Sequence, residues 1–336
     1  MSRRSLTRTA FAAAILTLPA VLPAAAQGEW RPTRPVEFVV TSGAGGGTDV
    51  FARTVQAAIT KHNLVPTSVI VTNKGAGSGA EGFVYARGAQ GDAHKVVFAT
   101  NNTWLLPMVA RVAFKAEDFR PVAILAFDEF MLWVKYDSPH RTAADFIAAA
   151  RAANPPLKMG GSQPKDTDQT LTSLIQRAAN VRFTYVPFRG GGEAGVQLAG
   201  GHVDANTNNP SESIGGWRGS QVRPVCVFRR EPMARGEMVT QSQGWHDIPT
   251  CSSQGIAIEE FSMPRTTFLP PGTTPAQQAF WVGVMRRVVE TPEWQEYITR
   301  TSQSTRFTTG EAFADHIRKD VETSRDIFQA EGWLVN

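Results

Sequence analysis

The sequence has few of the residues that build metal centres and disulfide frameworks, since its 336 residues include only two cysteines and six histidines. The histidines are scattered, and none is spaced from another ligand as in a zinc site. The G-x-S-x-G elbow of serine hydrolases and the G-x-x-x-x-G-K-S/T loop of P-loop NTPases are also absent. We therefore expect no metal ion and no other cofactor.

One cofactor motif does occur, because Gly77 to Gly82 spells G-x-G-x-x-G between a predicted strand and a predicted helix. A dinucleotide site also needs an acidic residue after the next strand, to hold a ribose hydroxyl. That strand, Lys95 to Thr100, ends at Asn101 instead. The motif therefore does not favour a dinucleotide enzyme.

Long apolar runs are absent except at the start of the chain. Arg3, Arg4 and Arg8 precede an apolar run over residues 10–22, and small residues follow at 24–26. The run has about 13 residues, whereas a membrane-spanning helix needs about 20. The pattern predicts a secretory signal peptide over residues 1–26 and a periplasmic mature protein.

An excess of positive charge is also absent once this leader is set aside. The chain carries 34 basic and 30 acidic side chains, a net charge of +4. Three of the arginines and none of the acidic residues lie in the leader, so 31 basic side chains face 30 acidic ones in the remainder. No later window has the run of lysine and arginine that nucleic acid binding requires. We expect no nucleic acid partner and a monomeric protein.

Both cysteines, Cys226 and Cys251, lie in the exported part of the chain. An oxidising compartment favours a disulfide between them. Two separate buried thiols are the alternative.

Strand-like and helix-like segments alternate over the first two-thirds of the chain, which favours parallel sheets with helices on both faces. An apolar stretch over residues 122–136, interrupted at Asp128 and Glu129, lies where one lobe would pass the chain to the next. The sequence from residue 274 onward has a helical pattern. The five strand and helix pairs are 36–40 with 48–62, 69–72 with 79–89, 95–100 with 104–111, 158–161 with 166–179, and 183–187 with 192–198.

Small-residue loops follow several of these strands. The loop over Thr41 to Asp49 leads into a helix, and the loops over Asn73 to Gly79 and Gly160 to Gln163 repeat the pattern. Glycines let backbone N–H groups approach a ligand, and a helix N-terminus favours an anion. A tight turn is the alternative for each loop alone, but several such loops in one chain indicate an anion-binding cleft.

Larger side chains follow other strands. Arg189 could clamp a carboxylate, although a surface arginine is the alternative. Asn101 and Asn102 offer amide contacts beside Trp104, for which core packing is an equal explanation. Asn208 lies in a group of asparagines that are typical of turns.

Several segments in this order and spacing resemble the extracytoplasmic solute-binding proteins of the tripartite tricarboxylate transporter family, also called the Bug family. The resemblance covers nearly the whole mature chain. It implies a two-lobed α/β protein of the type II-like periplasmic binding class, each lobe a mixed sheet flanked by helices and joined to the other by crossing strands. The segments are Arg34 to Val36, Gly45 to Asp49, Asn73 to Gly77, Asp118 to Val122, Val186 to Ala194, Gly200 to Asp204 and Pro270 to Pro275.

The expected lobes are residues 29–127 with 236–336, and residues 128–235. The resemblance implies a receptor, not an enzyme, that closes on a small di- or tricarboxylate, aliphatic or aromatic, and delivers it to a membrane permease. Family members hold one carboxylate through the first two loops, here Ser42 to Thr48 and Asn73 to Ala80. The residues that we predict to bind the ligand are Ser42, Ala44, Gly45, Gly46, Thr48, Gly77, Ser78, Asn101, Asn102, Gly161, Ser162, Gln163, Phe188, Arg189 and Asn208.

The sequence departs from the family pattern after Ser162. Many members continue with small residues, whereas this chain has acidic residues at Asp166 and Asp168. These would repel a second carboxylate unless they turn away as helix caps.

Two other functions stay open from the sequence. An exported hydrolase of a carboxylate ester or amide would use Ser162 or Ser42 with His202 as base, although no motif places an orienting carboxylate. A sensory receptor would present the same liganded form to a membrane kinase.

Overall fold

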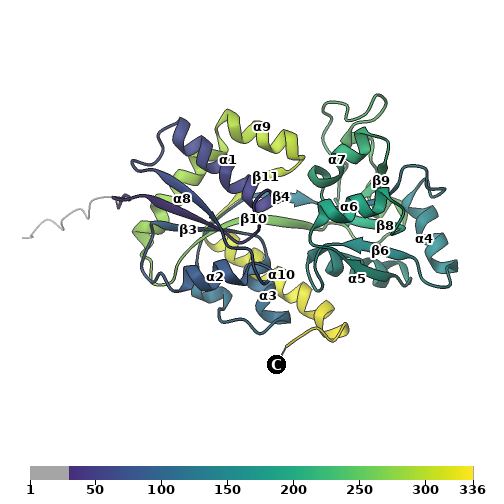
Figure 1. Cartoon of the computed structure of the whole chain (residues 1–336), viewed down its shortest axis with the longest axis horizontal. Helices are drawn as coiled ribbons and strands as arrows, with labels where there is room; N and C mark the ends of the chain where they lie inside the picture. The colour runs from purple at the N-terminus through teal and green to yellow at the C-terminus, as the bar shows by residue number, and fades with distance from the viewer. Residues whose placement is uncertain (1–29, 336) are drawn as a thin grey trace, which may run out of the picture.

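The computed structural model describes residues 30–335, so the predicted leader lies outside the described residues. Two lobes lie side by side and are joined by extended strands (Figure 1). No helix among these residues is long and apolar enough to cross a membrane.

The first lobe is built on a mixed sheet of six strands in the order β11-β4-β10-β3-β1-β2. Strands β1, β2 and β3 run parallel, whereas β10 and β11 run antiparallel to β4. The strands are β1 (Val36–Val40), β2 (Val69–Asn73), β3 (Lys95–Ala99), β4 (Arg120–Glu129), β10 (Ser262–Leu269) and β11 (Ser304–Thr308).

Helices cover both faces of this sheet because successive strand residues point to opposite sides. Phe98 packs at 5.1 Å from Phe51 in one core, and its neighbour Val97 lies in the core on the other face. One face carries α1 (Gly47–Lys61), α8 (Pro275–Val289) and α9 (Pro292–Thr301), and the other carries α2 (Ala80–Arg87), α3 (Asn102–Val109) and α10 (Gly310–Ala330).

The second lobe repeats this arrangement with five strands in the order β7-β6-β8-β5-β9. Strand β6 runs parallel to β7 and β8, and β5 runs antiparallel to β8 and β9. Its elements are β5 (Met131–Lys135), α4 (Ala143–Ala152), β6 (Lys158–Gly161), α5 (Thr167–Ala179), β7 (Thr184–Pro187), α6 (Gly191–Ala199), β8 (Ala205–Asn208), α7 (Pro210–Arg218) and β9 (Val222–Val227).

The five strand and helix pairs expected from the sequence are all present, with ends shifted by no more than two residues. The fold class is also confirmed, because each lobe is a mixed sheet flanked by helices. Cys226 and Cys251 form the expected disulfide in the core of the second lobe.

The crossing strands lie where the apolar stretch over residues 122–136 is interrupted. Strand β4 ends at Glu129, and β5 begins at Met131 in the other lobe. Strand β10 returns beside β4, with Met263 opposite Asp128. Between β9 and β10, Val239 and Ile258 pack into cores of the second lobe. We therefore propose that the chain returns to the first lobe at Ser262 and not at residue 236.

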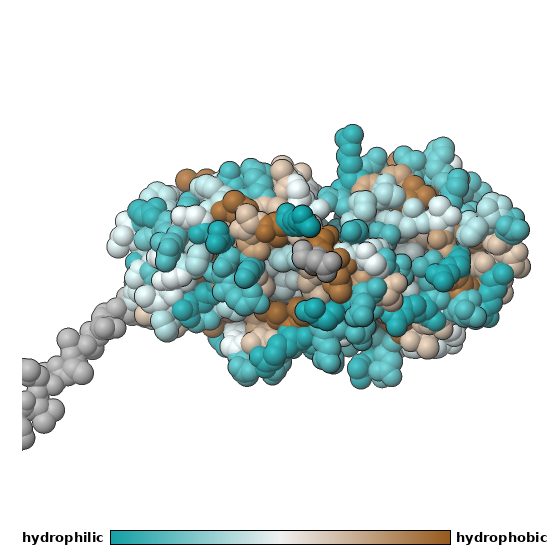
Figure 2. Space-filling view, turned by 90° about the horizontal axis from the view of Figure 1, so that it is seen from below, coloured by the Kyte–Doolittle hydropathy of each residue, from teal (hydrophilic) through white to brown (hydrophobic). Residues whose placement is uncertain are grey.

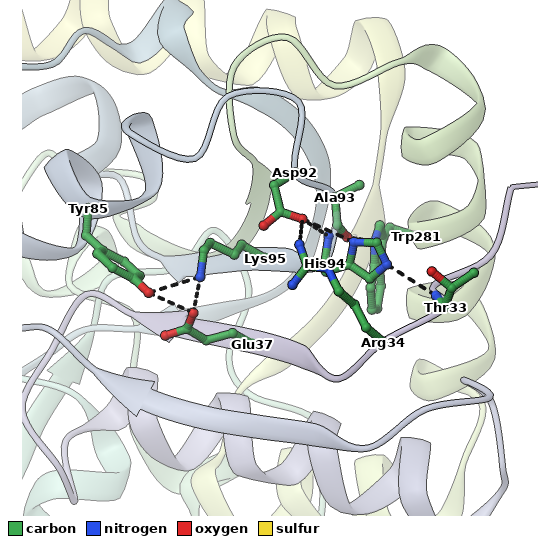
Figure 3. A network of polar contacts seen from close by, with 9 residues as sticks. All are labelled: Thr33, Arg34, Glu37, Tyr85, Asp92, Ala93, His94, Lys95 and Trp281. Carbon is green, nitrogen blue, oxygen red and sulfur yellow. Dashed lines mark hydrogen bonds and ion pairs between the residues drawn. The ribbon is translucent and has the colours of Figure 1, made fainter.

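A polar network anchors the first lobe at the amino ends of its strands (Figure 3). Lys95 at the start of β3 contacts Glu37 on β1 and lies 2.9 Å from the Tyr85 hydroxyl. Arg34 pairs with Asp92 at 2.7 Å. The charges and hydrogen-bonding groups of these side chains are paired with one another, at the end of the sheet away from the other lobe. The opposite ends of β1 and β2, their carboxyl ends, face the junction between the lobes.

Candidate functional site

A cleft of about 370 Å³ lies between the lobes, where the loops after the parallel strands of both sheets converge. The first lobe contributes the loops after β1, β2 and β3, and the second lobe those after β6, β7 and β8. The crossing strand β10 forms part of the floor with Met263 and Arg265. The cleft is lined by Thr41, Ser42, Gly43, Ala44, Gly46, Gly47, Thr48, Gly75, Ser78, Thr100, Asn102, Phe130, Ser162, Gln163, Asp166, Thr167, Asp168, Arg189, Gly190, Gly191, Asn209, Glu212, Met263 and Arg265.

The loop after β1 presents the N-terminus of α1 to the cleft. Gly46 caps this helix without a side-chain hydrogen bond, so backbone N–H groups of its first turn stay available to a ligand. Burial alone would raise the pKa of Asp49, but hydrogen bonds from Arg53, the Gly45 N–H and Asn73 lower it. Asp49 is therefore an anion occupied with holding the loop, and its charge is already balanced.

The loop after β2 packs closely against the first loop. A Cβ atom on Gly75 would lie 2.5 Å from the Ser42 carbonyl carbon and 2.6 Å from the Gly43 nitrogen. Gly79 has φ +93° and lies near the Thr41 carbonyl oxygen. The glycines of this loop thus serve to bring two backbone segments together at the cleft wall.

Polar contacts join the lobes beside the cleft. The Ser78 hydroxyl donates a hydrogen bond to Gln163 of the second lobe. Within the first lobe, Asn102 donates from Nδ2 to the Ser78 carbonyl at 3.3 Å and so supports this loop. Thr167 donates to Asn101 Oδ1 at 3.5 Å. The described structure therefore has the two walls already in contact at one edge.

The floor of the cleft holds a buried ion pair. Arg265 on β10 contacts Asp128 at the end of β4 and donates from Nη1 to Thr48 Oγ1 at 3.1 Å. Its side chain is 5% exposed and that of Asp128 is fully buried. Arg265 Nε and Asp128 Oδ1 have no hydrogen-bond partner among the described residues. This pair links the α1 loop directly to the crossing strands.

The wall of the second lobe carries three acidic side chains. Asp166 caps α5 by accepting from the Thr167 N–H at 2.8 Å, and Asp168 accepts from the Ser162 N–H at 2.6 Å. Burial, reinforced by the charge of Asp166, raises the pKa of Asp168 to about 8. Glu212 reaches solvent inside the cleft, yet the loss of bulk water around it and the charge of Asp128 raise its pKa to about 7.

Nine of the predicted site residues line the cleft, and the structure brings them together from both lobes. Six others do not line it. Gly45 donates to Asp49, Asn208 is buried and donates to the Gly191 carbonyl, and Phe188 packs against a core of the second lobe. Gly77 and Asn101 line neighbouring hollows, and Gly161 packs against Tyr185. The nine are Ser42, Ala44, Gly46, Thr48, Ser78, Asn102, Ser162, Gln163 and Arg189.

Sequence reasoning missed Glu212, Arg265 and Asn209 as cleft residues. Arg265 lies in a strand of mixed polar and apolar residues that returns from the second lobe late in the chain, so no local motif marks it. Glu212 had a signal, because it lies in the first turn of a helix that starts with Pro210 directly after a strand. His202, the base of the hydrolase hypothesis, does not line the cleft beside Ser42 or Ser162.

A second groove, of about 430 Å³, lies on the α10 side of the crossing strands. Several of its charged groups already have partners, since Arg306 pairs with Glu260 at 2.8 Å and Asp320 accepts from the Trp104 indole at 2.7 Å. From this side the lobes are largely hydrophilic, and apolar side chains gather near the middle of the molecule (Figure 2). The cleft at the strand ends, with its free helix terminus, is the better ligand site.

Comparisons with known proteins show what the whole chain is similar to. A family model described as "Tripartite tricarboxylate transporter family receptor" matches residues 51–333. A Cupriavidus necator protein named "UPF0065 protein in gbd 5'region" is 25% identical over 335 residues, which cover 98% of each chain.

Two solved structures have the same fold. A TctC solute binding protein from Polaromonas, solved without ligand, is 25% identical with a TM-score of 0.71, over 89% of this chain and 99% of that one. A protein of R. palustris solved with adipate is 22% identical with a TM-score of 0.77, over 90% of this chain and 98% of that one.

Proposed function

Because the chain belongs to the tripartite tricarboxylate transporter receptor family, we propose that it is a solute receptor that closes its lobes on a small carboxylic acid. In this proposal the protein works in the periplasm, hands its ligand to the membrane permease of a tripartite tricarboxylate-type transporter, and catalyses no reaction. The resemblance in sequence points to an aliphatic or aromatic di- or tricarboxylate as the ligand.

The observation that carries the proposal is the free N-terminus of α1 at the cleft. Its first-turn N–H groups lack a capping side chain, and the adjacent loop is built of glycine, alanine and serine. A helix N-terminus combines free donors with the positive end of the helix dipole, which favours a carboxylate. The exposed guanidinium of Arg189 from the opposite lobe could close on the same group.

The crossing strands support the closing motion. The lobes are linked through the short connection at Phe130 and through β10, so a change in a few backbone angles there would move one lobe as a body. A ligand contacted from both sides stabilises the closed arrangement.

A thermal-shift screen of carboxylic acids tests the proposal. The purified protein is unfolded, dialysed and refolded to remove any retained ligand. We expect at least one small acid to raise the melting temperature in a dose-dependent way, because a ligand that binds only the folded state stabilises it. A folded, ligand-free protein that no acid stabilises would contradict the proposal.

A further inference from the structure

The two walls of the cleft differ in charge. The wall of the first lobe offers backbone N–H groups, and the nearby Asp49, which does not line the cleft, is paired with Arg53 at 3.0 Å. The wall of the second lobe offers Asp166, Asp168 and Glu212. A ligand lying across the cleft therefore meets donors at one end and acceptors at the other.

The acceptors of the second wall are only partly used. Asp166 caps α5, and the Asp168 side chain accepts a hydrogen bond from the Ser162 N–H at 2.6 Å. Glu212 has no side-chain hydrogen bond or ion pair within residues 30–335. An ionised carboxylate can accept about four hydrogen bonds, so Asp168 and Glu212 keep capacity for a donor from a ligand.

The cationic groups near the cleft do not neutralise this wall. Arg265 is 4% exposed and already pairs with Asp128 and Thr48. Its Nε has no hydrogen-bond partner among the described residues, so it does not bond to the carboxylates of this wall. Arg189 is exposed, and Lys165 lines the adjacent opening and not the cleft itself. Three acidic side chains thus face one free arginine.

We propose that the ligand is a carboxylic acid that carries a cationic nitrogen at its other end, held by Asp168 and Glu212. This inference rests on the proposed receptor function and narrows the ligand class of the same cleft. Where Asp168 and Glu212 are ionised, a second carboxylate at that end would lie against two like charges, which costs free energy. The raised pKa values of Asp168 and Glu212 agree with an empty subsite, since a bound cation would supply the missing counter-charge.

Calorimetric titration with two matched sets of acids tests the inference. The flexible set is ε-aminocaproate, adipate and caproate, and the rigid set is para-aminomethylbenzoate, terephthalate and para-methylbenzoate. Each set keeps one carboxylate and changes only the far end from cation to anion to methyl. The proteins are the native chain, Glu212→Gln, and the control Glu322→Gln, an exposed position on α10 outside the cleft.

We expect the amino acid of at least one set to bind more than about tenfold more tightly than its diacid and its methyl partner. Glu212→Gln should weaken that binding by about tenfold, and Glu322→Gln should not change it. Tightest binding of a diacid, with no loss in Glu212→Gln, would overturn the cationic subsite and leave the carboxylate receptor intact. Failure of all six acids and of the wider acid screen would overturn both.

Discussion

At the scale of single residues, the cleft depends on glycines that let two loops touch. A Cβ on Gly75 would meet the backbone of Ser42 and Gly43 at 2.5 and 2.6 Å, and backbone atoms cannot move aside as a flexible side chain would. We expect Gly75→Ala to lower the free energy of unfolding by about 1 to 3 kcal/mol, as overpacking does. Urea denaturation measures this.

The matched control for this change is Gly43→Ala in the facing loop. A Cβ there has no heavy atom within 4 Å. The free energy of unfolding of Gly43→Ala should therefore stay close to that of the native chain. Equal stabilities for the two variants would show that the loops are not packed as described.

Arg189 lines the cleft from the second lobe. Its guanidinium is exposed at the cleft and has no side-chain partner among the described residues. If it meets a ligand carboxylate, Arg189→Ala should weaken binding more than about tenfold, since a hydrogen bond to a charged group contributes about 1.5 to 3 kcal/mol. Calorimetry with the tightest acid measures the loss. Arg182→Ala, at an exposed position outside the cleft, should bind as the native chain does, and unchanged affinity in Arg189→Ala would remove this residue from the site.

At the scale of elements, the junction of β4 and β10 holds the buried pair of Asp128 and Arg265. Removing one partner leaves an uncompensated buried charge, whereas replacing both with apolar residues can be nearly neutral. We expect Arg265→Met to cost about 3 to 5 kcal/mol of folding stability, and Asp128→Leu with Arg265→Met to recover most of it. A single variant as stable as the native chain, by urea denaturation, would contradict the pairing.

The strand and helix units were predictable because their apolar residues follow clear periods. Strand β8 (Ala205–Asn208) was not predictable in this way, because its residues are mostly polar and yet fully buried. Two of these side chains bond to residues distant in the sequence. Asn208 donates to the Gly191 carbonyl, and Thr207 donates to the Asp168 carbonyl. Likewise, residues 239–258 have little regular structure and join the second lobe through core packing, which sequence spacing cannot show. Their disulfide to Cys226 was predictable from the two cysteines.

The same limit applies to the candidate site. Glycine loops after strands could be recognised locally, and they line the cleft as expected. Arg265 could not be recognised locally. It contacts Thr48 at the start of α1, and the two residues are more than 200 positions apart in the sequence. The two aspartates were noticed in the sequence, but whether they cap α5 or face the cleft depended on the lobe geometry. They do both.

At the scale of the whole molecule, the acidic wall should make stability depend on pH. Asp168 and Glu212 have pKa values of about 8 and about 7 in the folded protein, above their usual values near 4. Between the usual and the raised value, the folded state holds more protons than the unfolded state. Stability therefore falls as pH rises across this range.

We expect the ligand-free protein to lose stability between about pH 6.5 and 8, and the variant with Asp168→Asn and Glu212→Gln to lose less. This window lies above most of the titration of the buried His316, whose lowered pKa acts in the opposite direction. Urea denaturation of both proteins at each pH measures the difference. Equal pH dependence in the two would show that the acidic wall does not hold extra protons.

In the proposed function, the free N-terminus of α1 receives a carboxylate in a cleft that both lobes close. The most direct test is calorimetric titration of the stripped native chain and of Gly46→Val with the best acid of the screen. A side chain on Gly46 would crowd the helix N-terminus, with its Cβ 3.2 Å from the Gly43 carbonyl oxygen. We expect saturable binding at one site per chain, abolished in a folded Gly46→Val protein. Equal binding by the two proteins would contradict it.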